Sequence, residues 1–286
     1  MNEFHKSCLL CGSPILVPAG PGYERVHLVR CRACGLAFSA RIPTREELAI
    51  NYGKYPRLNK ASPITLRRYE EWLDRFEGQR RLNRILDVGC GDGHFLDVAK
   101  RRGWNVFGTE FTENAVALCR SKGIHMHQGS IQSYQPDAAF DVVVSIEVLE
   151  HIYDGREHVA KIASLLRPGG HFYFTTPNFN SLSRRLLGSR WSAFEYPDHL
   201  TYYSPATVAR LLEDAGLRRV KLETTGFSRE RFLSAQSPGA SREGSDEELR
   251  RLVESKAHLR LAKSVVNRIL SFFRLGDTLK GTFCKA

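Results

Sequence analysis

The sequence has no long hydrophobic run. None of its segments approaches the ~20 consecutive apolar residues that a membrane-spanning helix needs, and its first ten residues, MNEFHKSCLL, lack the apolar core of a secretory signal peptide. Internal repeats and low-complexity tracts are also missing. These absences exclude membrane-spanning, collagen-like and wholly disordered proteins, and they predict a soluble protein made in the cytoplasm.

Cysteine is scarce, and its placement argues against a disulfide framework. The 286 residues contain seven cysteines, an odd number, whereas disulfide-rich secreted proteins usually carry an even set. Two Cys-x2-Cys pairs lie near the N-terminus with the spacing of a four-thiolate zinc site. Gly12 and Gly35 follow these pairs, where a tight turn favours a residue that accepts a positive φ. The members of the pairs are Cys8, Cys11, Cys31 and Cys34.

This pattern predicts a small zinc-ribbon-like module over residues 1–40. A segment of this length is too short to bury a stable core unaided, so we expect a bound Zn²⁺ to hold it together. The zinc is expected to be structural, because four thiolates close a tetrahedral shell and leave no position open for a substrate.

Acidic residues are outnumbered by basic ones. Lys and Arg total 42 against 31 Asp and Glu, which gives a net charge of +11 and suggests an anionic partner. The basic residues are spread over the module and over residues 67–84, 184–190 and 250–274 without a single stripe. The charge therefore fits an anionic substrate or an anionic surface about as well as RNA.

Residues 41–80 connect the module to the rest of the chain. Leu66, Tyr69, Trp72 and Phe76 recur there at helical spacing. This spacing predicts an amphipathic helix whose apolar side covers the next domain.

A glycine-rich turn opens the larger part of the chain, which spans residues 81–286. Residues 85–88 are predicted to form a buried strand, and glycines at 89, 91 and 93 lead directly into a helix from His94. Glycines let a ligand approach the backbone, and a helix N-terminus offers unpaired N–H groups. Glu110 ends the next predicted strand, where a carboxylate can accept both ribose hydroxyls of an adenosine.

Strands and helices alternate after this turn. We expect helices over residues 113–122 and 155–166, and strands over residues 124–128, 140–146 and 171–176. This alternation predicts an α/β fold in which a parallel sheet has helices on both faces.

Four motifs between residues 80 and 226 carry a family resemblance. LDVGCGDG, GTE, FDVVVSIEVLEHI and LLRPGGHFYFTTPN, in this order, resemble the class I S-adenosylmethionine-dependent methyltransferases. The resemblance implies a Rossmann-like, seven-stranded, mostly parallel sheet, with S-adenosylmethionine as the cofactor. It also implies a helix over residues 205–215, a strand over 219–225 and a closing antiparallel strand in 277–286, with an insertion at about 228–274.

The same resemblance assigns residues to the cofactor. Glu110 would hold the ribose. Many family members place an acidic residue after the third strand to bind the adenine amine, but this chain has Gly129-Ser130-Ile131. We therefore expect the adenine to contact either Ser130 or the backbone together with Phe111 and Ile131. The residues expected around the methionine part are Asp87, Gly89, Cys90, Gly91 and Gly93.

The candidate catalytic residues follow the fourth strand. The run EVLEH, with a distant histidine, resembles the E-x-x-E-H pattern of metal-dependent O-methyltransferases. If residues 147–151 begin a helix, the first and last of them share one face. Three roles are open for these candidate residues. They hold a second divalent metal that lowers the pKa of the acceptor oxygen, or His199 alone acts as a general base. In the third alternative they only cap a helix. The set consists of Glu147, Glu150, His151 and His199.

The acceptor is expected to be a hydroxyl on a small molecule, such as a sugar, a glycoconjugate or a secondary metabolite. No Asn/Asp-Pro-Pro-aromatic tetrapeptide follows the fourth strand, which speaks against methylation of amino groups. The sequence leaves open whether this acceptor is anionic or linked to a lipid. The alternatives are an RNA methyltransferase, which would hold RNA with the zinc module and basic surface, and a non-catalytic scaffold that keeps a cofactor pocket.

Residues 250–274 combine apolar residues at helical spacing with basic residues. One interpretation is a helix that covers the fold or forms a dimer contact. The other is a basic interfacial helix that contacts anionic lipid, which would place the protein at the inner face of the membrane. The sequence does not predict the oligomeric state.

Overall fold

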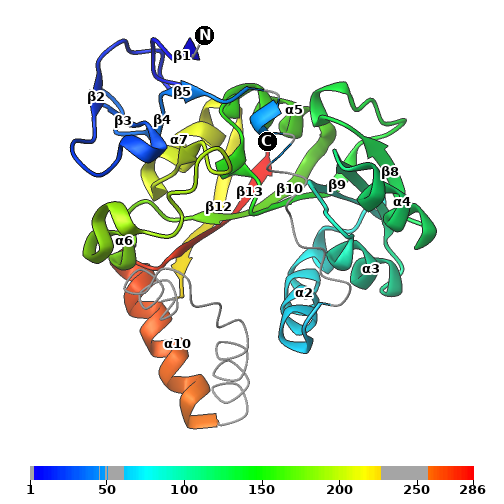
Figure 1. The fold of residues 1–286 in the computed structure, drawn as a ribbon. Coiled ribbons are helices and arrows are strands. Elements are labelled where there is room, and N and C mark those ends of the chain that lie inside the picture. The colour runs from blue at the N-terminus through cyan, green and yellow to red at the C-terminus, as the bar shows by residue number, and fades with distance from the viewer. Residues whose placement is uncertain (1–2, 45, 49, 51–60, 227–256) are drawn as a thin grey trace.

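The computed structural model describes residues 3–226 and 257–286, apart from 45, 49 and 51–60. Figure 1 shows a central sheet with helices on both sides and a small β-rich part built from the N-terminal residues. Among the described helices, none combines the length and the hydrophobicity of a membrane span.

The central sheet has seven strands in the order β12-β13-β10-β9-β6-β7-β8. Neighbouring strands from β10 through β8 are parallel, whereas β13 is antiparallel to both of its neighbours. This topology confirms the predicted seven-stranded, mostly parallel α/β fold. The strands are β6 (Arg84–Val88), β7 (Asn105–Glu110), β8 (His125–Gln128), β9 (Phe140–Ile146), β10 (Leu166–Pro177), β12 (Leu217–Thr225) and β13 (Thr278–Lys285).

Helices cover both faces of the sheet because alternate strand residues point to opposite sides. Val142 and Tyr173 pack with helices on one face, and Val143 and Phe172 pack with helices on the other. On the first face lie α2 (Pro63–Phe76), α3 (His94–Arg101) and α4 (Glu113–Ser121), and on the second lie α5 (Gly155–Leu165) and α7 (Pro205–Asp214).

Helix α2 confirms the amphipathic helix predicted in the connecting segment. Its first turn is capped by Ser62, whose hydroxyl accepts a hydrogen bond from the N–H of Thr65 at 3.3 Å. The ring centroids of Trp72 and Phe76 lie 5.0 and 5.8 Å from that of Tyr173 in β10. The helix therefore covers one face of the sheet with its apolar side.

Strand β10 begins at Leu166, earlier than the predicted residue 171. Leu166 already pairs with Phe140 of β9, and the regular register resumes at His171 after an irregularity. Glycines at 169 and 170 lie within this irregular part, which hid the start of the strand in the sequence.

The N-terminal residues form a small sheet that a later part of the chain completes. Its order is β11-β4-β3-β2, and β11 (Thr201–Tyr202) pairs antiparallel with β4 (Ala37–Ser39). Val26, Trp191 and Tyr202 share one buried cluster. The predicted 1–40 module is thus joined to residues 188–202 in space, and its boundary stays a prediction. The other short strands are β1 (Glu3–Phe4), β2 (Leu16–Pro18), β3 (Leu28–Cys31) and β5 (Arg41–Ile42).

Helix α10 (Ala257–Phe272) lies against β12 and precedes β13, whose antiparallel direction was predicted. It belongs to the expected insertion at 228–274, of which residues 228–256 lie outside the described part. Six further helices of the described residues are short: α6 (Leu182–Leu187), η1 (Glu24–Val26), η2 (Glu77–Gln79), η3 (Ile131–Ser133), η4 (Leu149–His151) and η5 (Gly188–Arg190).

Candidate active site

The turn between β6 and α3 follows the predicted glycine pattern. Gly89, Gly91 and Gly93 all have positive φ angles, of 71°, 51° and 72°. A Cβ at Gly89 would lie 2.8 Å from Val148, and one at Gly93 would lie 2.7 Å from the sulfur of Cys119. A Cβ at Gly91 would meet nothing within 4 Å, so this residue faces open space.

A cavity of about 670 Å³ lies beside this turn. Glu147, His151 and Leu200 belong to its wall, together with most of the predicted cofactor residues. The fold therefore brings predicted cofactor residues and part of the predicted catalytic set to one space. The cofactor residues in the wall are Gly89, Gly91, Glu110, Phe111, Ser130 and Ile131.

Among the predicted cofactor residues, Asp87, Cys90 and Gly93 do not belong to this wall. Burial first, and then the nearby acidic groups of Cys119 and Glu110, raise the pKa of Asp87 well above its usual range. Its Oδ1 is buried with no hydrogen-bond partner. Direct contact of Asp87, Cys90 and Gly93 with the cofactor stays a prediction.

Glu110 joins the glycine turn to the start of α4. Its Oε1 accepts hydrogen bonds from the N–H groups of Phe111 at 2.8 Å and Thr112 at 3.0 Å, and from the Thr112 hydroxyl at 2.8 Å. Its Oε2 accepts one from the N–H of Gly91 at 3.1 Å. The carboxylate is thereby fixed at the cavity wall at the end of β7.

His158 is a wall residue that sequence reasoning missed. It lies on α5, which packs against η3, and it is 3% exposed. Its Nε2 is buried and has no hydrogen-bond partner in the described part of the chain, and burial lowers its pKa to about 4. The only available signal was a histidine on the apolar side of a predicted amphipathic helix.

Glu150, His151 and His199 form a cluster in which Glu150 is buried and the two histidines are half-buried. One potential ligand atom of each lies within 4.8 Å of the others. The Glu150 Oε2 accepts a hydrogen bond from the Thr176 hydroxyl at 2.9 Å. The Nδ1 of His151 lies 2.8 Å from the carbonyl oxygen of Asp198, and the Nδ1 of His199 lies 2.8 Å from a carbonyl oxygen as well, that of residue 193.

The conditional helix over residues 147–151 is wrong. Glu147 has a φ of 54° and donates its N–H to the carbonyl oxygen of Thr175 at 3.0 Å. The single turn η4 follows, and α5 begins only at Gly155. The left-handed backbone at Glu147 interrupts the helical path, so Glu147 lies in the cavity wall but is not in the three-residue cluster.

Burial and nearby charged groups shift the pKa values of the side chains in this cluster. Burial, and then the nearby Glu147, raise the pKa of Glu150 to about 8. Burial would lower the pKa of His151, but the hydrogen bond to Asp198 and the charge of Glu150 raise it to about 9. Asp198, beside His199 in the sequence, lies 3.1 Å from the His151 Nδ1 through its Oδ1. The sequence signal for Asp198 was its position next to His199, a candidate catalytic histidine.

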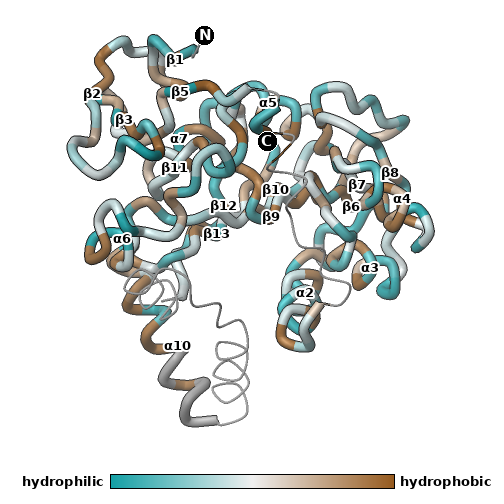
Figure 2. Tube along the Cα trace, in the orientation of Figure 1, coloured by the Kyte–Doolittle hydropathy of each residue, from teal (hydrophilic) through white to brown (hydrophobic). Residues whose placement is uncertain are grey.

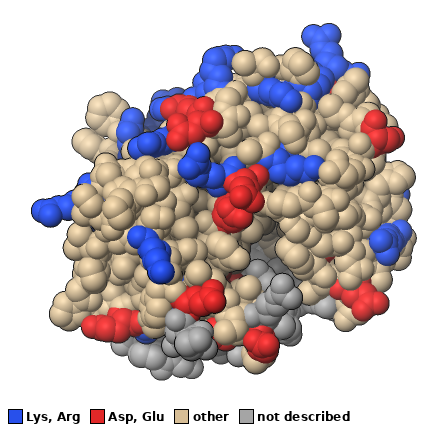
Figure 3. All heavy atoms as spheres, turned by 90° about the horizontal axis from the view of Figure 1, so that it is seen from above, with Lys and Arg blue, Asp and Glu red and all other residues tan. Residues whose placement is uncertain are grey.

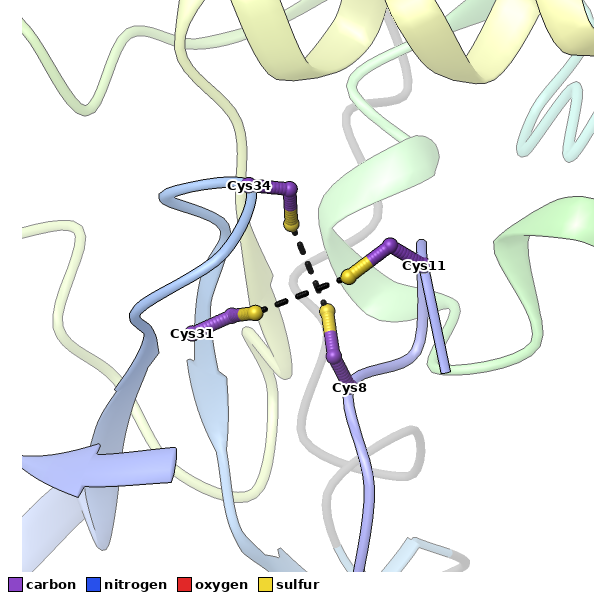
Figure 4. Close-up of side chains that lie close together, drawn as sticks. All are labelled: Cys8, Cys11, Cys31 and Cys34. Atoms are coloured by element: carbon purple, nitrogen blue, oxygen red, sulfur yellow. Dashed lines mark hydrogen bonds between the residues drawn. The ribbon is translucent and has the colours of Figure 1, made fainter. Parts of the chain in front are cut away.

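The four N-terminal cysteines converge as their spacing predicts. The sulfurs of Cys8 and Cys34 are 3.5 Å apart, and those of Cys11 and Cys31 are 3.6 Å apart. Figure 4 shows the side chains pointing toward one another from two turns. Burial would raise the pKa of Cys31, but hydrogen bonds from the backbone of residues 34 and 33 lower it to about 6.

The chain is similar to known proteins over its larger part. A family described as a methyltransferase domain matches residues 62–222. The ubiquinone biosynthesis O-methyltransferase of Aromatoleum aromaticum is 30% identical over 179 residues, which are 58% of this chain and 74% of that protein. The protein of the same name from Thiobacillus denitrificans is 30% identical over 205 residues, 64% of this chain and 85% of that protein.

Solved structures show the same fold. A SAM-dependent methyltransferase from Archaeoglobus fulgidus aligns with a TM-score of 0.54 and 21% identity, and the alignment covers 85% of this chain and 100% of that chain. The family match includes the glycine turn, Glu110 and the EVLEH run. The chain therefore belongs to the class I S-adenosylmethionine-dependent methyltransferases.

Proposed function

We propose that this methyltransferase transfers its methyl group to a hydroxyl oxygen of a small molecule. The observation that carries the proposal is the cluster of Glu150, His151 and His199 beside the cavity, because a carboxyl group and two imidazoles can hold a hydroxyl while one imidazole, that of His199, accepts its proton. The names of the two relatives, both O-methyltransferases, support oxygen as the acceptor atom. A sugar, a glycoconjugate or a secondary metabolite remains the proposed acceptor class.

The residues present fit S-adenosylmethionine. Open space at Gly91 lets a ligand lie against the turn, and the N-terminus of α3 offers N–H groups there. Among the described residues, the Glu110 Oε2 accepts one hydrogen bond, from Gly91, so it has lone pairs left for a ribose hydroxyl. The sulfonium of the bound cofactor makes the methyl carbon electrophilic, so the protein must align the acceptor and remove its proton.

The cluster also fits a divalent cation. Metal-binding histidines usually donate their second ring N–H to a carbonyl or carboxylate, which fixes the Nε2 toward the metal. The Nδ1 atoms of His151 and His199 each lie 2.8 Å from a backbone carbonyl oxygen. A cation would supply Lewis acidity at the acceptor oxygen. In the alternative without a cation, His199 accepts the hydroxyl proton itself.

We also propose that the four cysteines bind one structural Zn²⁺. A tetrahedral site with Zn–S bonds of about 2.3 Å places its sulfurs roughly 3.8 Å apart. The measured separations of 3.5 and 3.6 Å are close to this value. Gly12 and Gly35 have φ angles of 74° and 78°, as two matching metal-binding turns require.

The charge distribution on one face of the molecule favours a small acceptor over RNA. On the face seen in Figure 3, Lys and Arg side chains are interspersed with Asp and Glu, and they do not form a continuous basic track. RNA binding would need several phosphate contacts along such a track.

The test is methyl transfer by the purified protein to matched acceptor classes. Phenols, sugar derivatives and structured RNA would be incubated with methyl-labelled S-adenosylmethionine at low and high salt. We expect label in at least one hydroxyl compound, with little dependence on salt. Label in RNA alone, lost steeply as salt rises, would replace the proposal with the RNA alternative.

A further inference from the structure

Helix α10 presents its apolar side chains to solvent. At 100° per residue, six large apolar side chains fall within an arc of roughly 140° around the helix. Figure 2 shows hydrophobic residues along the described part of this helix. Their exposed fractions are 67% for Leu261, 48% for Val265, 49% for Val266, 52% for Ile269, 81% for Phe272 and 61% for Phe273.

The opposite side of α10 is the one that binds the sheet. Asn267 Oδ1 accepts a hydrogen bond from the N–H of Gly226 at 2.9 Å, and the Ser271 hydroxyl accepts one from the N–H of Thr224 at 3.3 Å. Between them Leu270 is only 9% exposed. A surface helix usually buries its apolar side and exposes its polar side, so α10 is inverted.

The C-terminal end of α10 is fixed to the carboxyl end of β10. The Asn178 side chain donates hydrogen bonds to the carbonyl oxygens of Arg274 at 3.1 Å and Gly276 at 2.7 Å. The N–H of Leu182 donates to the carbonyl oxygen of Leu275 at 2.9 Å. These bonds set the direction of the helix, which extends away from the sheet in Figure 1. The exposed apolar side is therefore held in place by the fold.

The charges on α10 are of one sign. Its sequence contains Arg260, Lys263 and Arg268 but no Asp or Glu. Arg268 is exposed and falls about 20° from Leu261 around the helix, at the edge of the apolar side. Arg274 is exposed just past the helix end. Two copies of this surface would bring like charges together, whereas an anionic partner would neutralise them.

We propose that α10 docks on a membrane surface that contains anionic lipid headgroups. The six apolar side chains enter the boundary between headgroups and acyl chains, and Arg268 and Arg274 contact the headgroups. Because α10 is bonded to the loop after β10, docking holds the carboxyl edge of the sheet, where the cavity lies, near the membrane. The proposal does not depend on the identity of the acceptor.

The experiment is vesicle co-sedimentation of the full chain. Vesicles of phosphatidylcholine alone are compared with vesicles that also contain phosphatidylglycerol, at low and high salt. The test variant carries Phe272→Ser and Phe273→Ser, and the matched control carries Ile15→Ser, because Ile15 is 56% exposed on the N-terminal sheet. Circular dichroism and S-adenosylmethionine binding show that each variant is folded.

We expect wild type and Ile15→Ser to bind anionic vesicles about tenfold more tightly than the double variant, with loss of binding at high salt. Equal binding of all three proteins, or no binding by wild type, would overturn the proposal. A wild type that dimerises without binding vesicles, while the double variant is monomeric in analytical centrifugation, would show that the surface joins two copies and would equally overturn it.

Discussion

The imidazole rings of His151 and His199 meet edge to face, with their centroids 4.9 Å apart. His151 ends the turn after β9, whereas His199 precedes β11, the strand that completes the N-terminal sheet. The N–H of Ser39 in β4 donates to the carbonyl oxygen of Leu200 at 2.8 Å. The cysteine module therefore positions one of the candidate catalytic histidines.

This relationship predicts that loss of the proposed structural zinc damages catalysis more than cofactor binding. A Cys31→Ser/Cys34→Ser variant loosens the small sheet and lets His199 shift, and a displacement of about 1 Å can lower the rate about 100-fold. S-adenosylmethionine affinity, measured by calorimetry, should change little because the glycine turn lies elsewhere. Cys284→Ser is the control. A double variant with normal turnover would show that the module does not position His199.

Glu150→Gln should lower kcat by about 10²- to 10⁴-fold, the usual contribution of a general acid or base. The amide can keep the contact with the Thr176 hydroxyl, so the fold and the S-adenosylmethionine affinity should be retained. Single-turnover rates and calorimetry separate the two effects. Glu157→Gln, an exposed change on α5, serves as the control. A kcat within twofold of wild type would remove Glu150 from the mechanism.

Exhaustive chelation tests the divalent cation. With the module zinc verified by elemental analysis, we expect chelation to abolish methyl transfer and an added divalent cation to restore it. Activity that survives chelation would eliminate the cation and leave His199 as the general base.

Glu110→Gln should weaken S-adenosylmethionine binding by about 1.5–3 kcal/mol, the value of hydrogen bonds to a charged group, which is roughly 10- to 100-fold in Kd. Calorimetry measures the change. Glu113→Gln removes the same charge from an exposed position a few residues on and should bind as wild type does. Unchanged affinity in Glu110→Gln would show that the ribose is held elsewhere.

The burial of His158 predicts that the stability of the fold depends on pH between 4 and 6.5. Burial lowers its pKa from 6.5 to about 4, so between these values the unfolded chain binds a proton that the folded protein does not. The free energy of unfolding should therefore fall by up to about 3 kcal/mol as the pH drops from 6.5 to 4. Urea unfolding of His158→Phe should lack this part of the dependence, whereas His125→Gln should keep it. Identical pH profiles for wild type and His158→Phe would contradict the burial of a neutral histidine.

Local patterns predicted most of the fold. The glycine turn, the alternation of strands and helices, and the helix that carries Trp72 depend on neighbouring residues, and the structure has all of them. The pairing of β11 with β4 could not be predicted, because two-residue strands leave no pattern and the partners are far apart in the sequence.

The sequence predicted which residues form the site but not how the backbone arranges them. The spacing of the four cysteines correctly predicted that they converge, and the EVLEH run correctly predicted Glu150 and His151 as members of one cluster. The left-handed backbone at Glu147 has no sequence signal in a non-glycine residue. His158 was hidden among the apolar residues of α5, and the inverted orientation of α10 depends on hydrogen bonds from Gly226 and Thr224.

The central claim is that the methyl group goes to oxygen. The most direct measurement is the structure of the product formed with deuterated-methyl S-adenosylmethionine, by mass spectrometry and nuclear magnetic resonance, for wild type and Glu150→Gln. The predicted result is a deuterated methyl ether on one hydroxyl, formed by wild type and nearly absent with the variant. A methyl group on carbon or nitrogen would contradict the account, and so would equal product from the variant.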